Sequence, residues 1–439
     1  MSLPIKERRR FYIHTLGCKV NQYESQAIRE LLAASGFEEA PSKDDADICI
    51  VNTCTVTAEA DRESKQVIGA LGKKNPSVAI VATGCLVERE AAFVALFPNV
   101  SHIVRNADKG SIADILKRIQ PLPQPRELRV SDFKSRSRAY LKIQDGCRNR
   151  CSYCKVCLVR SDLRSKPIPS ILDEISILVD NGFKEIVLTG ICLGAWGIDL
   201  YDKEGFEGPD TNKASLVSVL KAIDKLPGDF RLRLSSIEPK YVTDELIDFI
   251  AQNRRICRHL HVPLQSGDDD ILRKMNRPYS SSEYMEIINK IKGVIKDIAI
   301  TTDVIVGFPQ ETDAMFRNTL EFVRALQPSR THIFTFSPRD GTAAFKMAGH
   351  VSESVMKKRY DELSVIATES AKAYRKKFIG RELEILVETK RDALTGLLNG
   401  YSDNYIKVFF EGPNDIMKKI VSVKITAVNE IRTEGEYVR

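Results

Sequence analysis

The sequence lacks any apolar run that approaches the roughly 20 residues of a membrane-spanning helix. The apolar stretch at residues 11–16, which follows the basic residues Lys6, Arg8, Arg9 and Arg10, is too short for the hydrophobic core of a signal peptide. Internal repeats and low-complexity tracts are also missing, so the chain is not a repeat protein. With 43% hydrophobic and 28% charged residues, its 439 residues predict a cytoplasmic protein of two or three globular domains, with no membrane partner.

Cysteine is not scarce, because the chain has ten of them. In a cytoplasmic protein this number favours metal or redox chemistry over disulfides. The net charge of +7 is concentrated, since residues 126–166 hold 12 Lys or Arg and four Asp or Glu. Such a segment is either an RNA-binding surface or a solvated linker. On the first interpretation we expect RNA contacts from Arg136, Arg138, Arg160 and Arg164.

The pattern of apolar runs predicts an α/β protein in three parts. Residues 9–119 alternate strands at 11–16, 47–52 and 78–82 with helices at 23–35, 58–72 and 86–96, which is typical of a doubly wound parallel sheet. Three prolines within residues 120–126 indicate a linker, which we place at 120–135.

Residues 136–370 repeat the strand–helix pattern six times and predict a partial (β/α)6 barrel. Its strands are expected at 139–143, 185–189, 231–235, 259–262, 299–305 and 332–335, and its helices at 171–181, 216–226, 243–252, 281–292 and 312–326. Residues 371–439 contain short β-type runs at 383–388, 405–410 and 420–425, which predict a small all-β barrel of oligonucleotide-binding type.

Two sets of cysteines stand out. Cys147, Cys151 and Cys154 form a CxxxCxxC spacing, directly after the first predicted barrel strand. Three thiolates bind three irons of a [4Fe–4S] cluster and leave the fourth iron open to a small ligand. The neighbouring Tyr153 would shield the cluster or an adenine. A zinc site is the alternative, with Cys157 as its fourth ligand.

Cys18, Cys54 and Cys85 each follow a predicted parallel strand of the N-terminal domain. Because the carboxyl ends of parallel strands face one crevice, we expect these three sulfurs to converge, and Gly17 and Gly84 would let the backbone approach a cluster. The alternative is three ordinary core cysteines. We interpret the remaining cysteines as structural, namely Cys49, Cys192 and Cys257.

On these residues the chain resembles, over essentially its whole length, the methylthiotransferases of the radical S-adenosylmethionine superfamily. The resemblance implies two [4Fe–4S] clusters, one held by Cys147, Cys151 and Cys154 and an auxiliary one held by Cys18, Cys54 and Cys85. It also implies that the last part of the chain is an RNA-binding TRAM domain.

The resemblance extends to four segments that line the site for S-adenosylmethionine. They are LTGICLGAWGID, RLSSIEP, HVPLQSGDD and TDVIVGFPQETD, and each lies at a predicted strand end. The family pattern implies that cofactor contacts come from Tyr153, Thr189, Gly190, Ser235, Ser236, Glu238, Gln265, Asp303 and Gly307. Loop packing is the alternative for any one of them. The chain departs from the pattern at Lys155–Cys157, at Ser161 after Arg160, and at Asp340, which affects loop shape rather than cluster ligands.

The segment KVNQYES, at residues 19–25, is similar to the subgroup that acts on N6-threonylcarbamoyladenosine 37 of transfer RNA. The activity implied is insertion of a methylthio group at C2 of that base. Reductive cleavage of S-adenosylmethionine would supply the radical that removes the hydrogen, with no side-chain acid or base in the chemistry. The partners implied are the tRNA anticodon arm and a reducing electron donor such as flavodoxin or ferredoxin. Isopentenyladenosine tRNA and ribosomal protein S12 remain alternative substrates, and a zinc-stabilised, non-catalytic RNA-binding protein is an alternative of another class.

Overall fold

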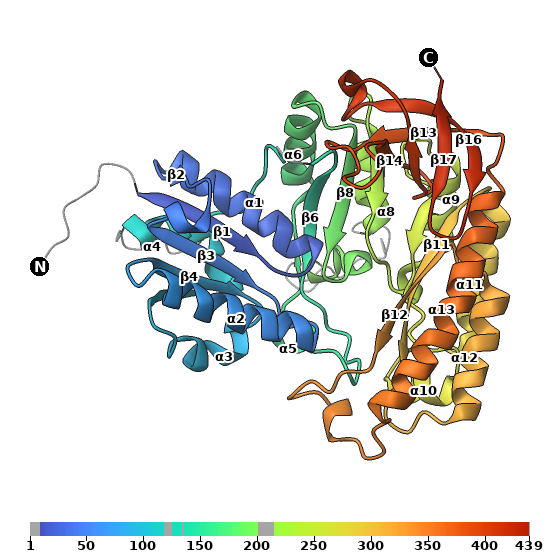
Figure 1. Cartoon of the computed structure of the whole chain (residues 1–439), viewed down its shortest axis with the longest axis horizontal. Coiled ribbons are helices and arrows are strands. Elements are labelled where there is room, and N and C mark those ends of the chain that lie inside the picture. Colours follow the sequence, from blue (N-terminus) through green and yellow to red (C-terminus); the bar gives the residue numbers. More distant parts are fainter. Residues whose placement is uncertain (1–8, 118–124, 134–135, 201–214, 439) are drawn as a thin grey trace, which may run out of the picture. The chain divides into compact units, whose positions relative to one another are not determined.

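The computed structural model describes residues 9–117, 125–133, 136–200 and 215–438. The chain forms two compact units. The first comprises Met1–Asp132 together with two short segments from later in the chain, Cys154–Ser161 and Arg339–Gly341. The second contains the remainder, Phe133–Tyr153, Asp162–Pro338 and Thr342–Arg439. Figure 1 shows the elements in sequence colours.

The first unit is built on a five-stranded parallel sheet with the strand order β2-β1-β3-β4-β5. Its strands are β1 (Arg10–Thr15), β2 (Glu38–Glu39), β3 (Ile48–Thr53), β4 (Ala79–Gly84) and β5 (Val100–Val104). The chain moves from β1 to β2 on one side and then returns to β3 on the other. The topological switch point, where ligands bind in such sheets, therefore lies between the carboxyl ends of β1 and β3.

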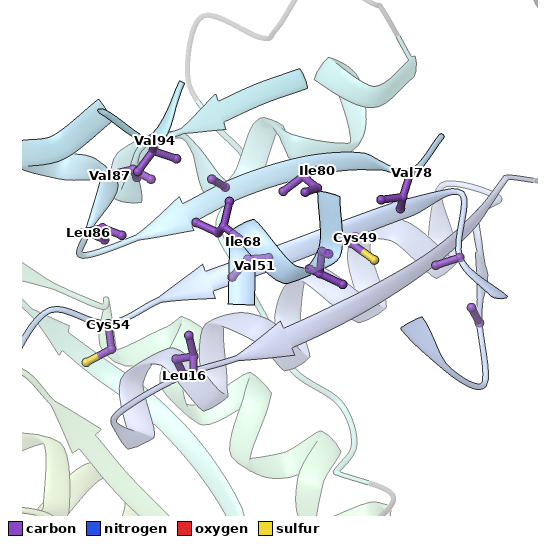
Figure 2. Packing of buried hydrophobic residues seen from close by; sticks show 14 residues of the cluster. Leu16, Cys49, Val51, Cys54, Ile68, Val78, Ile80, Leu86, Val87 and Val94 are labelled. Carbon is purple, nitrogen blue, oxygen red and sulfur yellow. The ribbon is translucent and has the colours of Figure 1, made fainter. Parts of the chain in front are cut away.

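Helices cover both faces of this sheet, as a doubly wound fold requires. Helices α1 (Lys19–Ala34) and α4 (Ile112–Lys117) bury Ile28, Leu32 and Ile112 against one face. Helices α2 (Ala58–Lys74) and α3 (Val87–Val94) bury Ile68 and Val94 against the other, with Val51 and Ile80 of the strands (Figure 2). The apolar runs of the strands are thus buried on both sides, which explains why they show no alternation with polar residues.

The second unit contains six parallel strands in sequence order. A four-stranded sheet has the order β7-β6-β8-β9, a three-stranded sheet has the order β10-β11-β12, and a parallel bridge between Leu232 and Ile256 connects them. This open arrangement confirms the predicted partial (β/α)6 barrel. The strands are β6 (Ala139–Asp145), the short antiparallel β7 (Arg164–Ser165), β8 (Glu185–Gly190), β9 (Arg231–Leu234), β10 (His259–His261), β11 (Ala299–Val306) and β12 (Arg330–Thr335).

Several helices of this unit begin at capping residues that the sequence provides. Ser280 and Glu283 form a reciprocal capping box at the start of α11, and Thr243 caps α9. The helices of this unit that the structure describes are α6 (Ile168–Asp180), α8 (Leu216–Asp224), α9 (Asp244–Gln252), α10 (Asp269–Lys274), α11 (Ser281–Val294), α12 (Asp313–Leu326) and α13 (Glu353–Lys376). The short helix α5 (Val156–Val159) belongs to the first unit.

The C-terminal residues form a closed five-stranded barrel, which confirms the all-β prediction. Its strands are β13 (Glu382–Val387), β14 (Leu398–Ser402), β15 (Lys407–Phe410), β16 (Ile420–Val428) and β17 (Thr433–Tyr437). Tyr374 of helix α13 and Phe378, which follows the end of that helix, pack into the core of this barrel together with Ala299 of β11. The small barrel is therefore continuous with the larger one inside the second unit.

Buried arginines complete this junction at the amino-terminal ends of β8 and β9. Glu185 accepts hydrogen bonds from Arg231 and Arg233 at 2.7 Å each. The same two arginines donate to backbone carbonyls of the small barrel, at Tyr401 and Ser402. Because RLRL is a strand whose four residues are all buried, its arginines require these partners.

Among the described residues, nine strands and helices were not predicted from the sequence, namely β2, β5, β7, β14, β17, α4, α5, α10 and α13. Helix α13 carries a buried stripe at helical spacing, but the stripe includes Arg359 and Ser370 and so lacks the contrast of an amphipathic pattern. Part of the predicted linker lies outside the described residues, at 118–124 and 134–135. The adjoining residues pack along α1, since the Tyr23 hydroxyl donates to the carbonyl of Leu128 at 2.7 Å.

Candidate cluster and cofactor sites

The first unit places Cys18, Cys54 and Cys85 after β1, β3 and β4, at the carboxyl edge of the sheet. Cys18 is the N-cap residue of α1 and is exposed, whereas Cys54 and Cys85 are buried. Burial raises the pKa of Cys54 to about 11, and the nearby sulfurs of Cys85 and Cys18 also raise it. The three cysteines therefore lie along the carboxyl edge of the sheet, and the charges of Cys85 and Cys18 act on the thiol of Cys54.

The backbone around these cysteines is arranged for close approach. Gly17 has φ +84°, and a Cβ atom there would lie 2.5 Å from the sulfur of Cys54. Asn21 of α1 donates to the carbonyls of Leu16 and Thr53, at 2.8 and 2.9 Å, and so joins the ends of β1 and β3. Three thiols of this kind, one of them exposed, fit a cluster with one open coordination position. A metal would also ionise thiols whose pKa is raised without it.

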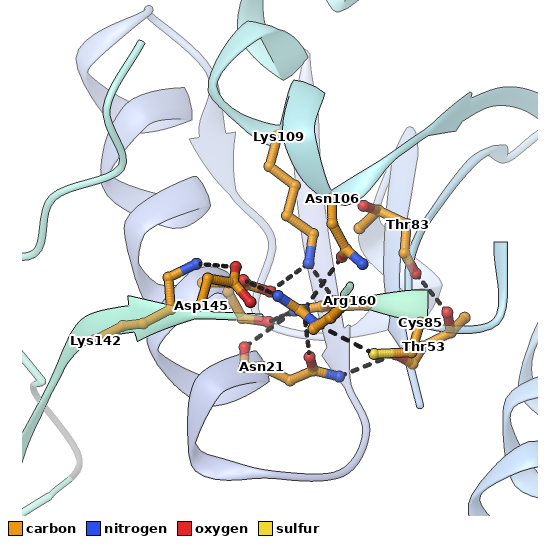
Figure 3. A network of polar contacts seen from close by, with 12 residues as sticks. Asn21, Thr53, Thr83, Cys85, Asn106, Lys109, Lys142, Asp145 and Arg160 are labelled. Atoms are coloured by element: carbon orange, nitrogen blue, oxygen red, sulfur yellow. Dashed lines mark hydrogen bonds and ion pairs between the residues drawn. The ribbon is translucent and has the colours of Figure 1, made fainter. Parts of the chain in front are cut away.

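A buried polar network lies beside Cys85 (Figure 3). The guanidinium of Arg160 donates to the sulfur of Cys85 at 3.4 Å and to both carboxylate oxygens of Glu24 at 2.9 Å. Lys109 forms an ion pair with the same carboxylate and donates to Asn52 at 3.1 Å. Burial lowers the pKa of Lys109, and the charge of Glu24 opposes that effect. The network thus contains two cations within the first unit, and one of them, Arg160, is in direct contact with an expected cluster ligand.

In the second unit, Cys147 and Cys151 lie in the loop that follows β6, at the carboxyl edge of the barrel. Cys154 belongs with the first unit, where its carbonyl oxygen lies 3.3 Å from the Cys157 sulfur. The Cys157 thiol thus donates to the backbone.

Two residues beside these ligands were not predicted. Cys147 packs against Cys192, and interaction with that thiol is the largest cause that lowers the pKa of Cys147. Cys192, which we interpreted as structural, is therefore part of the ligand environment. Arg277 lies 3.2 Å from the sulfur of Cys151 and forms an ion pair with Glu238. No sequence signal marked Arg277, because an arginine in the loop NRPYS has no spacing that links it to a cysteine.

The residues expected to contact S-adenosylmethionine lie on successive strand ends. Thr189 and Gly190 end β8, Ser235 and Ser236 follow β9, Gln265 follows β10, and Gly307 follows β11. The hydroxyl of Ser235 is buried and has no hydrogen-bond partner among the described residues. A buried hydroxyl without a protein partner is available to hydrogen-bond a ligand. Tyr153 packs against an apolar cluster that includes Phe308 and Met275.

Other expected cofactor residues have partners within the protein. Glu238 is paired with Arg277, and Asp303 lies 3.1 Å from His261 on the neighbouring strand β10. His332 of β12 is opposite Asp303 in register, and the ligand atoms of His261, Asp303 and His332 lie within 4.8 Å of one another. Gly307 has φ +76°, and a Cβ atom there would collide with Met356, so this glycine serves packing.

The arginines expected to contact RNA fall into two groups. Arg164 is exposed, with a side-chain accessibility of 57%, and Arg136 stacks on the ring of Tyr140. Arg138 is mostly buried, pairs with Glu388 at 2.7 Å and stacks on Tyr401, so it serves the junction with the small barrel. The RNA contact expected from Arg160 is wrong, because this side chain is buried beside Cys85 and Glu24.

Comparison with known families agrees with this geometry. Residues 10–105 match the family described as uncharacterized protein family UPF0004, residues 141–323 match the radical SAM superfamily, and residues 376–438 match the TRAM domain. The barrel with a CxxxCxxC loop at its carboxyl edge therefore defines a radical S-adenosylmethionine enzyme.

Full-length relatives define the family more closely. The chain is 37% identical to the threonylcarbamoyladenosine tRNA methylthiotransferase MtaB of Bacillus subtilis, over 97% of this chain and 96% of the relative. It is 38% identical to the protein of the same name from Thermotoga maritima, over 95% and 94%. A tRNA-2-methylthio-N(6)-dimethylallyladenosine synthase of Clostridium tetani is 34% identical over 98% and 96%. The chain belongs to the radical S-adenosylmethionine methylthiotransferase family.

Among solved structures, the radical S-adenosylmethionine methyltransferase TsrM from Kitasatospora setae is similar in fold, with a TM-score of 0.55 and 14% identity over 75% of each chain. That likeness concerns the fold alone. In the described part of the chain, no helix is both long and apolar enough to cross a membrane.

Proposed function

We propose that this protein inserts a methylthio group at C2 of N6-threonylcarbamoyladenosine 37 in transfer RNA. The observation that carries the proposal is the position of six cysteines at the carboxyl edges of the parallel sheet and of the barrel. Three follow strands of the parallel sheet, and a CxxxCxxC loop follows the first strand of the barrel. Relatives that bear the threonylcarbamoyladenosine name are 35–38% identical over nearly the whole chain, whereas those with the dimethylallyladenosine name are 32–34% identical.

Each cysteine set would hold one [4Fe–4S] cluster, with S-adenosylmethionine at the cluster of the barrel. When bound, these groups supply a radical able to remove an unactivated hydrogen and a sulfur to replace it. The chain's own residues bind and orient. Arg277 places a positive charge beside Cys151 and holds Glu238, and the free hydroxyl of Ser235 is available to a polar group of the cofactor.

The RNA would contact exposed basic residues near the cysteine loop and the small barrel. Arg148, Arg150 and Arg164 are exposed in the second unit. On the small barrel, Lys407 and Arg432 both lie over the ring of Phe409, an arrangement that suits stacked bases and phosphates. We further propose a cytoplasmic location, the domain limits given above, and a flavodoxin or ferredoxin as electron donor.

The test is the nucleoside content of tRNA from a deletion strain, with and without the gene returned. The methylthio derivative of threonylcarbamoyladenosine should vanish in the deletion and return with the wild-type gene. A variant with Cys147, Cys151 and Cys154 replaced by Ala should not restore it. Unchanged threonylcarbamoyladenosine products, with loss of the isopentenyladenosine derivative instead, would contradict the substrate.

A second substrate is favoured by one observation, the 34% identity to the dimethylallyladenosine enzyme over 98% of this chain. Purified enzyme should discriminate between the two. A site that hydrogen-bonds the threonyl group loses those partners on an apolar substituent, so its rate should fall by several orders of magnitude. Comparable rates on both tRNAs would show that the site is not built for the threonyl group.

A further inference from the structure

Arg160 follows one set of cysteines in the sequence but contacts a cysteine of the other set in the structure. It lies six residues after Cys154, and it caps the C-terminus of the short helix α5. Its side chain is buried within the first unit, to which α5 also belongs, and is 5% exposed. Its partners there come from α1, from the end of β4 and from residue 106. The family resemblance gives this arginine no role, and the charge pattern suggested an RNA contact instead.

The contacts of Arg160 fix the guanidinium in position. Two nitrogens donate to the two oxygens of Glu24 at 2.9 Å, which is the bidentate geometry that orients arginine most firmly. The third, Nε, is then 3.4 Å from the sulfur of Cys85. Further donation to Asn106 at 3.2 Å and to Asn21 at 3.4 Å leaves the side chain little freedom. Glu24 in turn is held by Lys109, which is fully buried.

A fixed cation that donates to a cysteine sulfur has a defined effect on an iron–sulfur cluster. Hydrogen bonds to ligand sulfurs and the local net charge are among the factors that set cluster reduction potentials. Reduction adds one negative charge, so a nearby positive charge favours the reduced form. In a buried site this interaction is screened much less than at the surface.

We propose that Arg160 is a positioning residue of the auxiliary cluster, and that its hydrogen bond to Cys85 and its buried charge raise the reduction potential of that cluster. The inference rests on the proposed function, since it requires a cluster on Cys18, Cys54 and Cys85. Glu24 has the opposite effect on the potential, because its negative charge belongs to the same network. Its role is to hold the guanidinium in place.

The experiment uses the full-length chain with Cys147, Cys151 and Cys154 replaced by Ala, so that only the auxiliary cluster remains. The cluster is reconstituted, iron is measured, and the reduction potential is obtained by a redox titration followed by EPR. Arg160→Gln should lower the equilibrium constant for one-electron reduction by tenfold or more, which corresponds to about 59 mV towards negative potential. Arg160→Lys retains the charge but has no Nε to donate to Cys85, so its shift should be smaller.

Two further variants make the result specific. Glu24→Gln removes a negative charge and should shift the potential in the positive direction. Lys74→Gln, whose partner Asp44 is exposed, changes the charge of the same unit and should have no effect. If the parent triple variant binds no iron, the auxiliary cluster itself is wrong and the inference fails with it. If iron is bound and neither Arg160→Gln nor Glu24→Gln moves the potential, only the inference is overturned. If Arg160→Gln loses its cluster, the potentials of Arg160→Lys and Glu24→Gln test the inference instead. Unchanged potentials in both variants overturn the inference.

Discussion

Arg233 and Glu185 form an ion pair, Nε to Oε1 at 2.7 Å, in which the two side chains are 2% and 0% exposed. Arg231 pairs with the same carboxylate, and both arginines donate to carbonyls of the small barrel. One carboxylate thus supports two cations at the junction of the two barrels. Stability at this junction depends on Glu185 more than on any exposed ion pair.

Glu185→Gln should therefore be strongly destabilising. It leaves two buried guanidinium groups without their shared charge, and loss of one partner of a buried pair costs about 3–5 kcal/mol. Urea unfolding followed by circular dichroism measures the change. Glu245→Gln is the matched control, because its pair with Lys221 is 54% exposed on each side and should contribute under about 1 kcal/mol. Equal effects of the two variants would contradict this role for Glu185.

The same carboxylate predicts a pH dependence. Burial alone would raise the pKa of Glu185, but Arg233 and Arg231 lower it by more, to about 2. A carboxyl with a lower pKa in the folded state contributes stability that is complete above its unfolded pKa and is lost as the pH falls through its folded pKa. Stability should decline between about pH 4.5 and pH 2, by roughly 3 kcal/mol for this group. Glu185→Gln should flatten that part of the profile, and an unchanged slope would argue against the shift.

Gly17→Ala should damage the auxiliary site specifically. The new Cβ would lie 2.5 Å from the Cys54 sulfur, at a positive φ that costs about 1–2 kcal/mol for any other residue. Iron content should fall by about half, because one of two equal clusters is lost. Gly36→Ala is the control, since Gly36 has φ +90° with nothing within 4 Å. It imposes the same backbone strain, and it should retain full iron.

Variants that lack one or the other set of cysteines should differ in the products that they form. With Cys147, Cys151 and Cys154 replaced by Ala, roughly half the iron should remain and no 5′-deoxyadenosine should form. With Cys18, Cys54 and Cys85 replaced, reduction should still yield 5′-deoxyadenosine, but no methylthio product. Iron assay and chromatography of both variants give the answer. A methylthiolated product from the second variant would mean that those cysteines are ordinary core residues.

Reversal of exposed basic residues should weaken tRNA binding. Arg148, Arg150 and Arg164 are exposed, and if each contacts a phosphate, their joint change to Glu should reduce the salt slope of log K by roughly two to three. The measurement is tRNA affinity at several salt concentrations. Lys74→Glu, on the exposed end of α2, should leave the slope unchanged. If the triple reversal also leaves it unchanged, the basic segment is not an RNA-binding surface.

Local sequence determined most of the fold and the positions of the cysteines. Buried strands appear as short apolar runs, and a cysteine directly after such a run is placed at the sheet edge by the strand itself. The surroundings of Arg160 and Cys192 could not be predicted, for a common reason. Their roles depend on Glu24, Cys85 and Cys147, which are distant in sequence, and neither charge nor spacing encodes such partners. Helix α13 was missed because a buried arginine and serine interrupt its apolar stripe.

The arginines of β9 make the larger barrel of this chain dependent on the smaller one. A domain that is merely tethered can be gained or lost without change to its neighbour. Here Arg231 and Arg233 project from the larger barrel and use carbonyls at Glu384, Tyr401, Ser402 and Asp403 of the smaller one. A radical barrel that evolved without this C-terminal domain would leave those guanidinium groups without acceptors. In this chain the larger barrel therefore requires the smaller one as a permanent partner.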